Sequence, residues 1–520
     1  MNLAHECLEK NVRRIPDRKA VVDGNTGTVY SYADLNERVN ALANALRSLG
    51  IEKGDRVALY LPSTPEFIIA FFAITKIGAI TVPFNTMFKR LELEYILNNC
   101  GAKCIIGAAD RVVETVLPIL KDLPSLEHII CVGDFSASQD NDRIVGFDEL
   151  LSSHSGKFEA IDLRGDDAVS LLYTSGTTGK PKGALASHDN WVSMAALHAY
   201  QVVFMTDEDV ILSGFPLFHV ALVITVLPTF YAGAAIITMQ RFFPREALAL
   251  ITKYNATHFM GTPTMWAYLI DEYQQDENAY DLSALWLGQC SGAPLAAELH
   301  KRIQECFGVG LVECYGATEC SSTVTHTRFR HTLTGSVGWP SPGWEIKITD
   351  DDGNELPNGE IGVLCCKGPG VVKEYWNDPR MTAAKLGDGW WWSGDLAYIK
   401  NGGRFDGQLY LVDRADDMIV CGGYNIYPAE VEAFLAEHPK VLQAFVVGIP
   451  DDVKGQIPKA FIVLERGENC TEEEIVSFSK DVMAAYKAPR RAEFVTLDDL
   501  PQTASGKVLK RELRAMEENP

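Results

Sequence analysis

Residues 173–183 read YTSGTTGKPKG and follow directly on the apolar run Val169–Leu172. Glycines let backbone N–H groups close around an anion, hydroxyl groups add rotatable donors, and the two lysines supply charge. The stretch therefore predicts a phosphate-binding loop at the end of a buried strand, and with it nucleotide chemistry. It is not a Walker loop, because Pro181 occupies the place of that pattern's second glycine, counted from Gly176. A polar turn between two strands is the alternative.

Composition limits the class of protein. With 520 residues, 47% of them hydrophobic, the chain can bury more than one core and is expected to form two to four domains. A formal net charge of -22 argues against binding nucleic acid or anionic lipid through bulk electrostatics. Residues 1–18 mix charges into every turn and lack the apolar core of a signal peptide, so a cytoplasmic location is expected.

The twelve cysteines allow disulfides or a metal site as one interpretation. No CxxC pair and no Cys/His cluster at zinc spacing occurs in the sequence. Free, buried thiols are therefore expected.

One apolar stretch, Val220–Met239, has no charge over twenty residues, which is long enough to cross a bilayer. Pro228 and Gly233 interrupt it. We expect a buried helix that ends near Pro228, then a turn and a β-rich run over Ala234–Met239. No transmembrane segment is therefore expected.

Helical and strand patterns alternate from the N-terminus to about residue 310. Residues 31–50 predict an amphipathic helix that begins with a capping box of Ser31 and Asp34 and ends at Gly50. Residues 56–61 predict the strand that follows. This alternation predicts an α/β fold of layered sheets covered by helices.

Two further units follow along the chain. Short strands with Gly, Pro and Asp turns predict a β-rich subdomain over about 335–413. Residues 417–520 predict a small α+β domain of common size. We therefore expect an N-terminal domain over 1–413, a hinge at 414–416 and the C-terminal domain after it. The last helix of the chain is expected to carry an apolar stripe of Leu509, Leu513 and Met516.

Three shorter motifs offer nucleotide-binding groups. In YGATE, Tyr315 can stack on a base, Thr318 can donate to a phosphate and Glu319 can hold Mg²⁺. An ordinary turn is the alternative. Asp395 follows a glycine turn in WWWSGDL and suits the paired hydroxyls of a ribose, with a solvated acid as the alternative. Lys507 lies in a polar loop, where most lysines are solvated.

Taken together and in this order, YTSGTTGKPKG, YGATE, GDL, DRADD and Lys507 extend over essentially the whole chain. In this combination the chain resembles the acyl-adenylate-forming superfamily of acyl-CoA synthetases, luciferases and peptide-synthetase adenylation domains. The resemblance implies ATP and CoA as cosubstrates, Mg²⁺ bound by Glu319, and catalysis by Lys507, Glu319 and Thr318. The nucleotide-binding residues that it implies are Thr174, Ser175, Gly176, Thr177, Thr178, Gly179, Lys180, Lys182, Gly292, Ala293, Pro294, Tyr315, Gly316, Asp395 and Arg414.

The implied chemistry accounts for these residue types. A carboxylate attacks the α-phosphorus of ATP and pyrophosphate leaves, so charge develops at the phosphates and has to be neutralised. No general base is needed, because the nucleophile is already ionised at neutral pH. By resemblance, Lys507 bridges the acid and the α-phosphate. A thiol then attacks the carbonyl of the acyl-AMP.

The resemblance also implies that the C-terminal domain rotates between the two half-reactions. The hinge residue lies two positions after the arginine of DRADD, at Asp416. Gly422, Gly423 and Tyr424 would then replace the lysine loop and line a pantetheine tunnel. Tyr424 occupies a position that often holds glutamate, which leaves its CoA contacts open. Lys487 belongs to a basic cluster that is expected at the CoA phosphates, with Lys454, Lys459, Arg490 and Arg491, and a solvated face is the alternative.

The string FPLFHV at 215–220 indicates the branch of the superfamily. Amino-acid-activating members carry an aspartate here, and without it an ammonium group would enter an apolar pocket unpaired. FPLFHV resembles the acyl- and aryl-CoA ligases, in which the histidine, here His219, lies beside the acyl pocket. A satisfied core histidine is the alternative.

The expected substrate is an uncharged hydrophobic acid of the medium-chain aliphatic, alicyclic or aromatic class. A luciferase-like enzyme, a carrier-protein acyl ligase and a non-catalytic acyl or nucleotide binder on the same fold are the alternatives. A homodimer is left open. The expected acyl pocket contains His219, Val220, Ala221, Trp266 and Cys320, beside Gly292 and Ala293.

Overall fold

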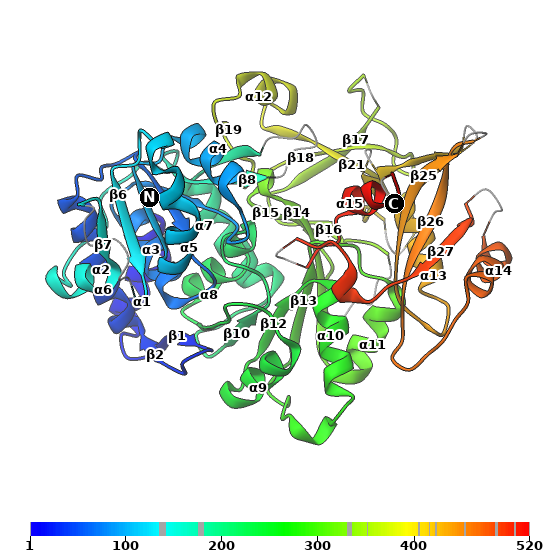
Figure 1. Ribbon diagram of the computed structural model, residues 1–520, viewed down its shortest axis with the longest axis horizontal. Helices are drawn as coiled ribbons and strands as arrows, with labels where there is room; N and C mark the ends of the chain where they lie inside the picture. The colour runs from blue at the N-terminus through cyan, green and yellow to red at the C-terminus, as the bar shows by residue number, and fades with distance from the viewer. Residues whose placement is uncertain are drawn as a thin grey trace.

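The computed structural model describes residues 2–134, 142–174, 181–329, 335–350, 352–403, 406–414, 417–421, 424–451, 454–483, 487–503 and 506–518. Two large sheets form most of the N-terminal part, and a smaller sheet near the C-terminus stands at the opposite side of the molecule (Figure 1). Mixed α/β layers with a separate small C-terminal domain confirm the predicted fold class.

The first large sheet has eight strands in the order β19-β9-β8-β4-β3-β5-β6-β7. Its strands from β8 to β7 are parallel, whereas β9 runs antiparallel to β8 and β19 antiparallel to β9. The strands are β3 (Arg56–Tyr60), β4 (Ile80–Pro83), β5 (Cys104–Ala108), β6 (His128–Val132), β7 (Ile144–Gly146), β8 (Ala168–Thr174), β9 (Lys182–Ser187) and β19 (Glu374–Tyr375).

The second large sheet has nine strands in the order β16-β15-β14-β13-β12-β10-β11-β1-β2. Parallel pairing runs from β14 to β1, and antiparallel strands close both edges. The strands are β1 (Lys19–Asp23), β2 (Val29–Ser31), β10 (Val210–Ser213), β11 (Ala235–Thr238), β12 (His258–Gly261), β13 (Leu287–Ser291), β14 (Gly310–Ala317), β15 (Ser322–His326) and β16 (Trp339–Pro340).

Helices cover both faces of these sheets. One continuous core buries α2, α3, α7 and α8 together with strands of both sheets, a second core joins α9, α10 and α11 to the nine-stranded sheet, and a third joins α4 and α5 to the eight-stranded sheet. The result is a stack of alternating helical and sheet layers. The helices are α1 (Lys10–Arg14), α2 (Tyr32–Ser48), α3 (Pro65–Lys76), α4 (Arg90–Cys100), α5 (Ala109–Arg111), α6 (Phe147–Ser153), α7 (His188–Leu197), α8 (Val226–Ala232), α9 (Pro244–Tyr254), α10 (Pro263–Tyr273) and α11 (Ala297–Phe307).

The β-rich subdomain is a five-stranded antiparallel sheet with the helix α12 (Pro379–Lys385) beside it. Residues 401–408, an insert with no expected role, lie between β21 and β22, where Trp339 Nε1 donates to the carbonyl of Asp406 at 3.0 Å. The insert thereby ties this hairpin to β16. The strands are β17 (Glu345–Thr349), β18 (Gly362–Lys367), β20 (Leu386–Gly387), β21 (Trp390–Ile399) and β22 (Leu409–Arg414).

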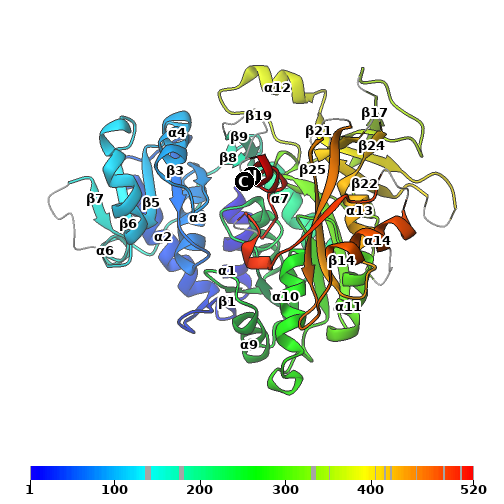
Figure 2. The same cartoon turned by 45° about the vertical axis from the view of Figure 1, so that its right-hand side comes forward.

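The C-terminal domain holds its own five-stranded sheet, which Figure 2 shows beside α10 and α11. Arg302 of α11 pairs with Glu465, and Tyr268 of α10 packs into the core around Leu497 and Leu513. The domain therefore docks on the outer helices of the nine-stranded sheet. Its elements are β23 (Ile419–Cys421), β24 (Tyr424–Ile426), α13 (Pro428–Leu435), β25 (Val441–Asp451), β26 (Gly455–Leu464), α14 (Glu472–Val482), β27 (Arg491–Phe494) and α15 (Lys510–Glu518).

The structure confirms the predicted ends of α2 but not the predictions for α8 and α15. The capping box of Ser31 and Asp34 is present at α2, and the helix stops before Gly50, which has φ +74°. The prediction that a helix ends near Pro228 is wrong, because Pro228 lies in the first turn of α8, where its missing N–H costs nothing, and the helix ends at Gly233. The apolar stripe of α15 is also partly wrong: Leu513 is buried, but Met516 is exposed.

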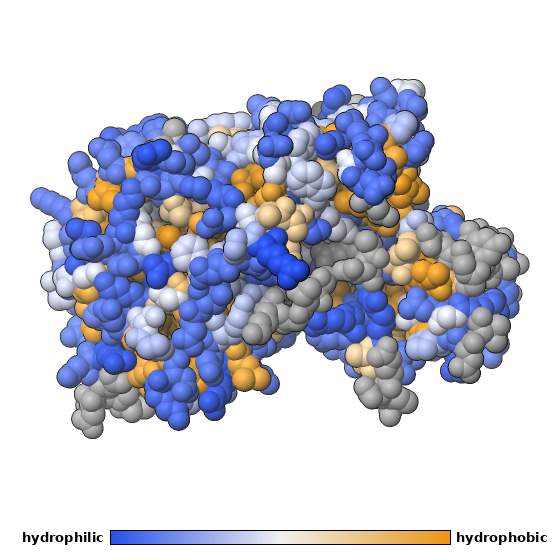
Figure 3. Space-filling view, turned by 90° about the horizontal axis from the view of Figure 1, so that it is seen from above, coloured by the Kyte–Doolittle hydropathy of each residue, from blue (hydrophilic) through white to orange (hydrophobic). Residues whose placement is uncertain are grey.

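Among the residues that the structure describes, no helix has both the length and the apolar character needed to cross a bilayer. The face seen in Figure 3 is mainly hydrophilic, with its hydrophobic residues in small separate groups.

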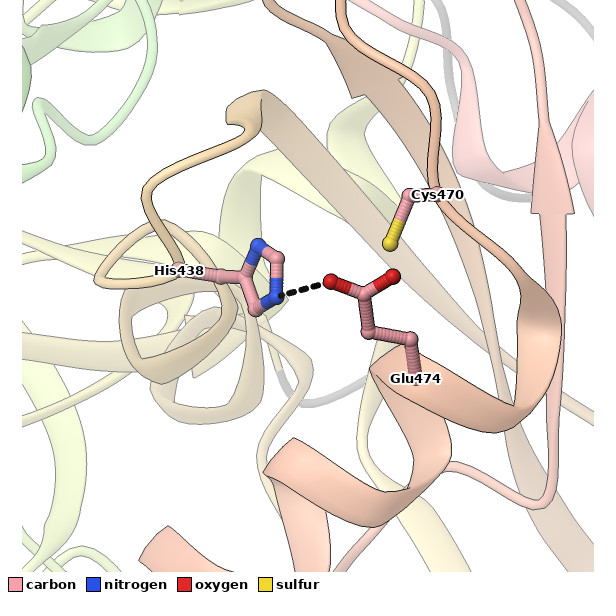
Figure 4. A group of neighbouring side chains, drawn as sticks. All are labelled: His438, Cys470 and Glu474. Atoms are coloured by element: carbon pink, nitrogen blue, oxygen red, sulfur yellow. Dashed lines mark ion pairs between the residues drawn. The ribbon is translucent and has the colours of Figure 1, made fainter.

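All twelve cysteines are free, and all except Cys306 and Cys470 are buried, as expected. In the C-terminal domain, Cys470 lies with His438 and Glu474 in the one group of potential metal ligands that the described residues form (Figure 4). Lys440 Nζ already pairs with Glu474 at 2.9 Å, and the Lys440 N–H donates to His438 Nδ1 at 3.3 Å. Protein contacts therefore account for this group without a metal.

Candidate active site

The opening motif is the connection of an antiparallel hairpin. Thr174 ends the buried strand β8 and faces Lys182 at the start of β9, and the Thr174 hydroxyl donates to the Lys182 carbonyl at 3.4 Å. Lys182 Nζ lies 3.8 Å from Met381 Sδ of α12. The connection therefore follows a buried strand, which agrees both with the predicted phosphate-binding loop and with the alternative of a polar turn between two strands. The predicted phosphate ligands Ser175, Gly176, Thr177, Thr178, Gly179 and Lys180 lie outside the described residues.

Two motifs that are eighty residues apart meet through one hydrogen bond. The Tyr315 hydroxyl donates to Asp395 Oδ2 at 2.5 Å, which joins the end of β14 to β21. Burial, and next the charge of Asp395, raise the pKa of Tyr315 well above its usual value, so the phenol stays protonated and remains the donor. Arg414 is the cross-strand neighbour of Asp395 on β22, so three predicted nucleotide-binding positions gather here.

Glu319 is tied to the other side of the site. The Tyr375 hydroxyl donates to Glu319 Oε1 at 3.0 Å, and Tyr375 pairs with Ala184 on β9. The carboxylate that the sequence assigns to Mg²⁺ is therefore linked to the strand that follows the predicted phosphate loop. Its neighbour Thr318 begins a short 3₁₀ helix, Thr318–Cys320, at the end of β14 and is half-buried.

The turn between β14 and β15 requires glycine at position 316. A Cβ atom there would lie 1.6 Å from the carbonyl oxygen of Ser322, far inside van der Waals contact. Ser321 and Ser322 both have positive φ, at +49° and +98°, so the chain reverses sharply. Glycine at 316 thus lets the backbone after Tyr315 pass close to the returning strand.

The loop that carries Lys507 reaches the N-terminal domain. A Cβ atom built on Gly506 would lie 3.5 Å from Thr262 Oγ1, and one built on Gly292 would lie 3.7 Å from Thr262 Cγ2. Thr262 is the residue that caps α10. The C-terminal loop, Thr262 and the predicted adenine loop with Gly292, Ala293 and Pro294 therefore converge.

The predicted acyl-pocket residue His219 lies near Lys507. Burial, and next the nearby charge of Lys507, lower the pKa of His219 to about 4. The imidazole is neutral at pH 7. His219 is nevertheless exposed to solvent. This does not fit the alternative of a core histidine.

Four of the five predicted acyl-pocket residues lie on one side of the nine-stranded sheet. Val220, Ala221 and Cys320 share the central core, and His219 precedes Val220 at the cap of its 3₁₀ helix. Trp266 does not join them. It belongs to the outer core with α9 and α11, covers Gly288 from that face, and donates from Nε1 to the Gln289 carbonyl at 3.1 Å. The sheet separates Trp266 from the others.

The predicted CoA-binding and hinge residues are only partly described. Asp416, Gly422 and Gly423 lie outside the described residues, and Tyr424 begins the strand β24. Lys487 Nζ pairs with both carboxylate oxygens of Glu430, at 2.6 and 2.7 Å.

The structure adds site residues that the sequence analysis did not single out. Thr262 lies beside the Gly292 and Gly506 loops, and the Tyr375 hydroxyl donates to Glu319. Thr262 precedes a proline at a helix start, which is a readable cap signal but says nothing of a ligand. Tyr375 has no local signal, because its partner lies 56 residues earlier in the chain.

Comparison with known proteins agrees with this geometry. Residues 8–376 match the family model for the AMP-binding enzyme, and residues 430–507 match that for the AMP-binding enzyme C-terminal domain. A feruloyl-CoA synthase from Amycolatopsis sp is 35% identical over 514 residues, 97% of each chain. A long-chain-fatty-acid–CoA ligase from Bacillus subtilis (strain 168) is 34% identical, over 97% of this chain and 93% of its own.

Among solved structures, the anthranilate CoA ligase AuaEII in complex with anthranoyl-AMP superposes with a TM-score of 0.92 at 30% identity, over 100% of this chain and 97% of that one. The chain belongs to the AMP-binding enzyme family. Since its relatives are CoA ligases along their whole length, it is an acid–thiol ligase of the AMP-forming type.

Proposed function

We propose that the enzyme activates an uncharged hydrophobic carboxylic acid and transfers it to CoA. The acid's carboxylate oxygen attacks the α-phosphorus of ATP, the bond to the bridging oxygen breaks, and pyrophosphate leaves. The CoA thiol then attacks the acyl carbonyl, loses its proton, and displaces AMP. The observation that carries this proposal is the Tyr315–Asp395 hydrogen bond between two distant motifs, with the Lys507 loop beside Thr262 and the Gly292 loop.

Each residue has a role that fits its surroundings. Tyr315 and Asp395 form a hydrogen-bonded wall on which adenosine would rest, with Asp395 accepting from the ribose hydroxyls. Thr318 would donate to the α-phosphate. Lys507 would stabilise the charge that develops there, and the hydroxyl loop between Thr174 and Lys182 would hold the leaving pyrophosphate.

Glu319 fits Mg²⁺, which prefers one or two carboxylates with phosphate oxygens and water completing the octahedron. The Tyr375 hydrogen bond to Oε1 orients the half-buried carboxylate, as partners of metal-binding carboxylates do. When bound, the ion would neutralise phosphate charge. Glu319 and Tyr375 are the residues that would position it.

The acid is of the medium-chain aliphatic, alicyclic or aromatic class. Support comes from the apolar neighbours Val220, Ala221 and Cys320, from the neutral His219, and from relatives whose names refer to ferulate, long-chain fatty acids and anthranilate. Trp266 is not part of this pocket in our proposal, because it packs on the opposite face of the sheet.

We further propose the domain boundary at 414–416 and a rotation about Asp416. The contact of the Lys507 loop with Thr262 suits adenylation, and Gly422, Gly423, Tyr424 and Lys487 would serve the CoA step. Asp416→Pro, which fixes φ, should leave pyrophosphate release intact and abolish thioester formation. An equal fall of both rates would show that Asp416 is structural instead.

The proposal also includes a cytoplasmic location and a homodimer. A cytoplasmic enzyme would meet ATP and CoA there, and cell fractionation tests this. A homodimer would double the mass found by light scattering, and a single-chain mass would exclude it.

The decisive experiment is pyrophosphate release from ATP across a panel of aliphatic, alicyclic and aromatic acids, with and without CoA. Acid-dependent release and CoA-dependent AMP formation are expected. Release without any transfer to CoA would favour a carrier-protein ligase, light emission in oxygen would favour luciferase chemistry, and no release with any acid would favour a non-catalytic binder.

A further inference from the structure

A buried chain of hydrogen bonds crosses the inner face of the nine-stranded sheet. The Thr323 hydroxyl of β15 lies 3.4 Å from His198 Nδ1, and His198 Nε2 lies 2.9 Å from Gln289 Oε1 of β13. His198 begins the π-helical turn His198–Val202 that follows α7. All three side chains are within 1% of full burial.

The direction of these hydrogen bonds follows from the charge of the histidine. Burial lowers the pKa of His198 to about 3, so the ring is neutral at pH 7 and has one N–H and one acceptor nitrogen. Nε2–H donates to Gln289 Oε1, and Nδ1 accepts from the Thr323 hydroxyl. This arrangement turns the amide nitrogen of Gln289 away from His198.

The amide nitrogen of Gln289, Nε2, has no hydrogen-bond partner among the described residues, although the side chain is fully buried. An unmade hydrogen bond of this kind costs about 1–3 kcal/mol, and native structures rarely keep one without a reason. A ligand that accepts from Nε2 would remove this cost.

The position of Gln289 indicates which ligand. Gln289 and Ser291 point to the same face of β13, about 7 Å apart along the strand, and their neighbours on β14 are Val312 and Cys314. Ser291 leads directly into the loop of Gly292, which contacts Thr262 at the candidate site. Gln289 therefore lies one side-chain layer deeper than the place where the acyl-adenylate would form.

The elements that surround Gln289 also surround the expected acyl pocket. The 3₁₀ helix Val220–Val223, which carries predicted acyl-pocket residues, packs against α7 and β15, the elements on either side of the His198–Thr323 contact. Thr323 is also the cross-strand partner of Gly316. The polar chain and the expected acyl pocket thus share one core, while Trp266 covers the far side of β13.

We propose that Gln289 is a specificity-determining residue that donates a hydrogen bond from Nε2 to a neutral oxygen at the far end of the acyl group. The inference rests on the proposed function and narrows its substrate class to acids with a distal hydroxyl, ether or carbonyl oxygen, such as ring-substituted aromatic acids. His198 and Thr323 are positioning residues that fix the amide. The neutral His198 offers no charge to a distal carboxylate, and a buried unpaired charge is costly.

The test uses pairs of acids that differ only in this oxygen. Pyrophosphate release with ATP is measured for 4-hydroxybenzoate against 4-methylbenzoate and for 4-methoxycinnamate against 4-ethylcinnamate, so that two lengths are covered. In at least one pair, the oxygen-bearing acid should have a kcat/KM about 10- to 100-fold higher, mostly through KM. Equal values in both pairs would overturn the proposal.

The variant Gln289→Met keeps the length of the side chain and removes the amide. It should reduce the preference to less than about threefold. Gln408→Met is the matched control, since Gln408 is also fully buried with an unpartnered amide nitrogen among the described residues, but lies in the β-rich subdomain. A preference that persists in Gln289→Met, or that disappears equally in Gln408→Met, would refute the assignment.

A second variant tests the positioning role and includes a readout that misfolding would change. His198→Gln leaves Gln289 in place and removes its support, so the preference should shrink while the KM for ATP stays unchanged. An unchanged preference in this variant would contradict the positioning role. If fatty, alicyclic and aromatic acids all fail to release pyrophosphate with the unaltered enzyme, the proposed function fails, and the inference with it; activity without an oxygen preference refutes the inference alone.

Discussion

Replacing Lys507 with methionine should separate the two half-reactions. The loop itself should persist, because residue 507 is held through its backbone: its N–H donates to the Thr503 side-chain Oγ1 at 3.1 Å, and the Thr503 N–H donates to its carbonyl at 2.8 Å. Only the ammonium is lost. Removing one preorganised charge or donor from a developing oxyanion costs about 2.7–4 kcal/mol, or about 10²–10³ in rate.

Two assays check this expectation. Acid-dependent pyrophosphate release should fall by about 10²–10³-fold, while conversion of supplied acyl-AMP and CoA to thioester should stay within about threefold of the unaltered enzyme. Lys480→Met, at an exposed lysine of α14, is the control and should change neither rate. An equal loss in both half-reactions would refute the assignment of Lys507 to adenylation.

An independent readout comes from His219. Burial is the larger cause of its low pKa and the charge of Lys507 the smaller, so Lys507→Met should raise the pKa of His219 without restoring its usual value. The sign follows because removing a nearby cation removes a repulsion that disfavours the imidazolium. An NMR titration of the His219 ring measures it, and an unchanged pKa would mean that the two side chains are not neighbours in solution.

Three other substitutions test separate features. Lys76 is fully buried with Glu9 at 2.6 Å, so Glu9→Gln should destabilise the fold by about 3–5 kcal/mol in urea denaturation, and a loss below about 1 kcal/mol would contradict this. Burial favours a higher pKa for Glu9, but Lys76 outweighs it and lowers the pKa, so this stabilisation is present at neutral pH and is lost as pH falls through the lowered pKa. Gly316→Ala should abolish pyrophosphate release, since its Cβ would overlap a carbonyl oxygen at 1.6 Å; near-normal activity would show that the turn can open. Tyr375→Phe should raise the Mg²⁺ concentration for half-maximal rate by about 10-fold or more, and an unchanged Mg²⁺ dependence would dissociate Tyr375 from the metal site.

The sequence by itself determined what is encoded within a few residues. The capping box at Ser31 and the stop at Gly50 depend on neighbours in the chain, and the structure has them as expected. The order of the motifs was enough to identify the family. Pro228 was misjudged because a proline ends a helix or begins one according to the residues that precede it, and these were read as helix.

Only the tertiary structure decided which side chains meet. The register of β13 turns Gln289 toward the central core and His198, while the packing of α10 places Trp266 in the outer core on the other face of the sheet. Likewise, Tyr375 reaches Glu319 only because β19 pairs with β9. Successive residues of a strand point to opposite faces of the sheet, so a shift of register by one residue would move each side chain from the central core to the outer core. That register is set by pairing with strands that are far away in the chain.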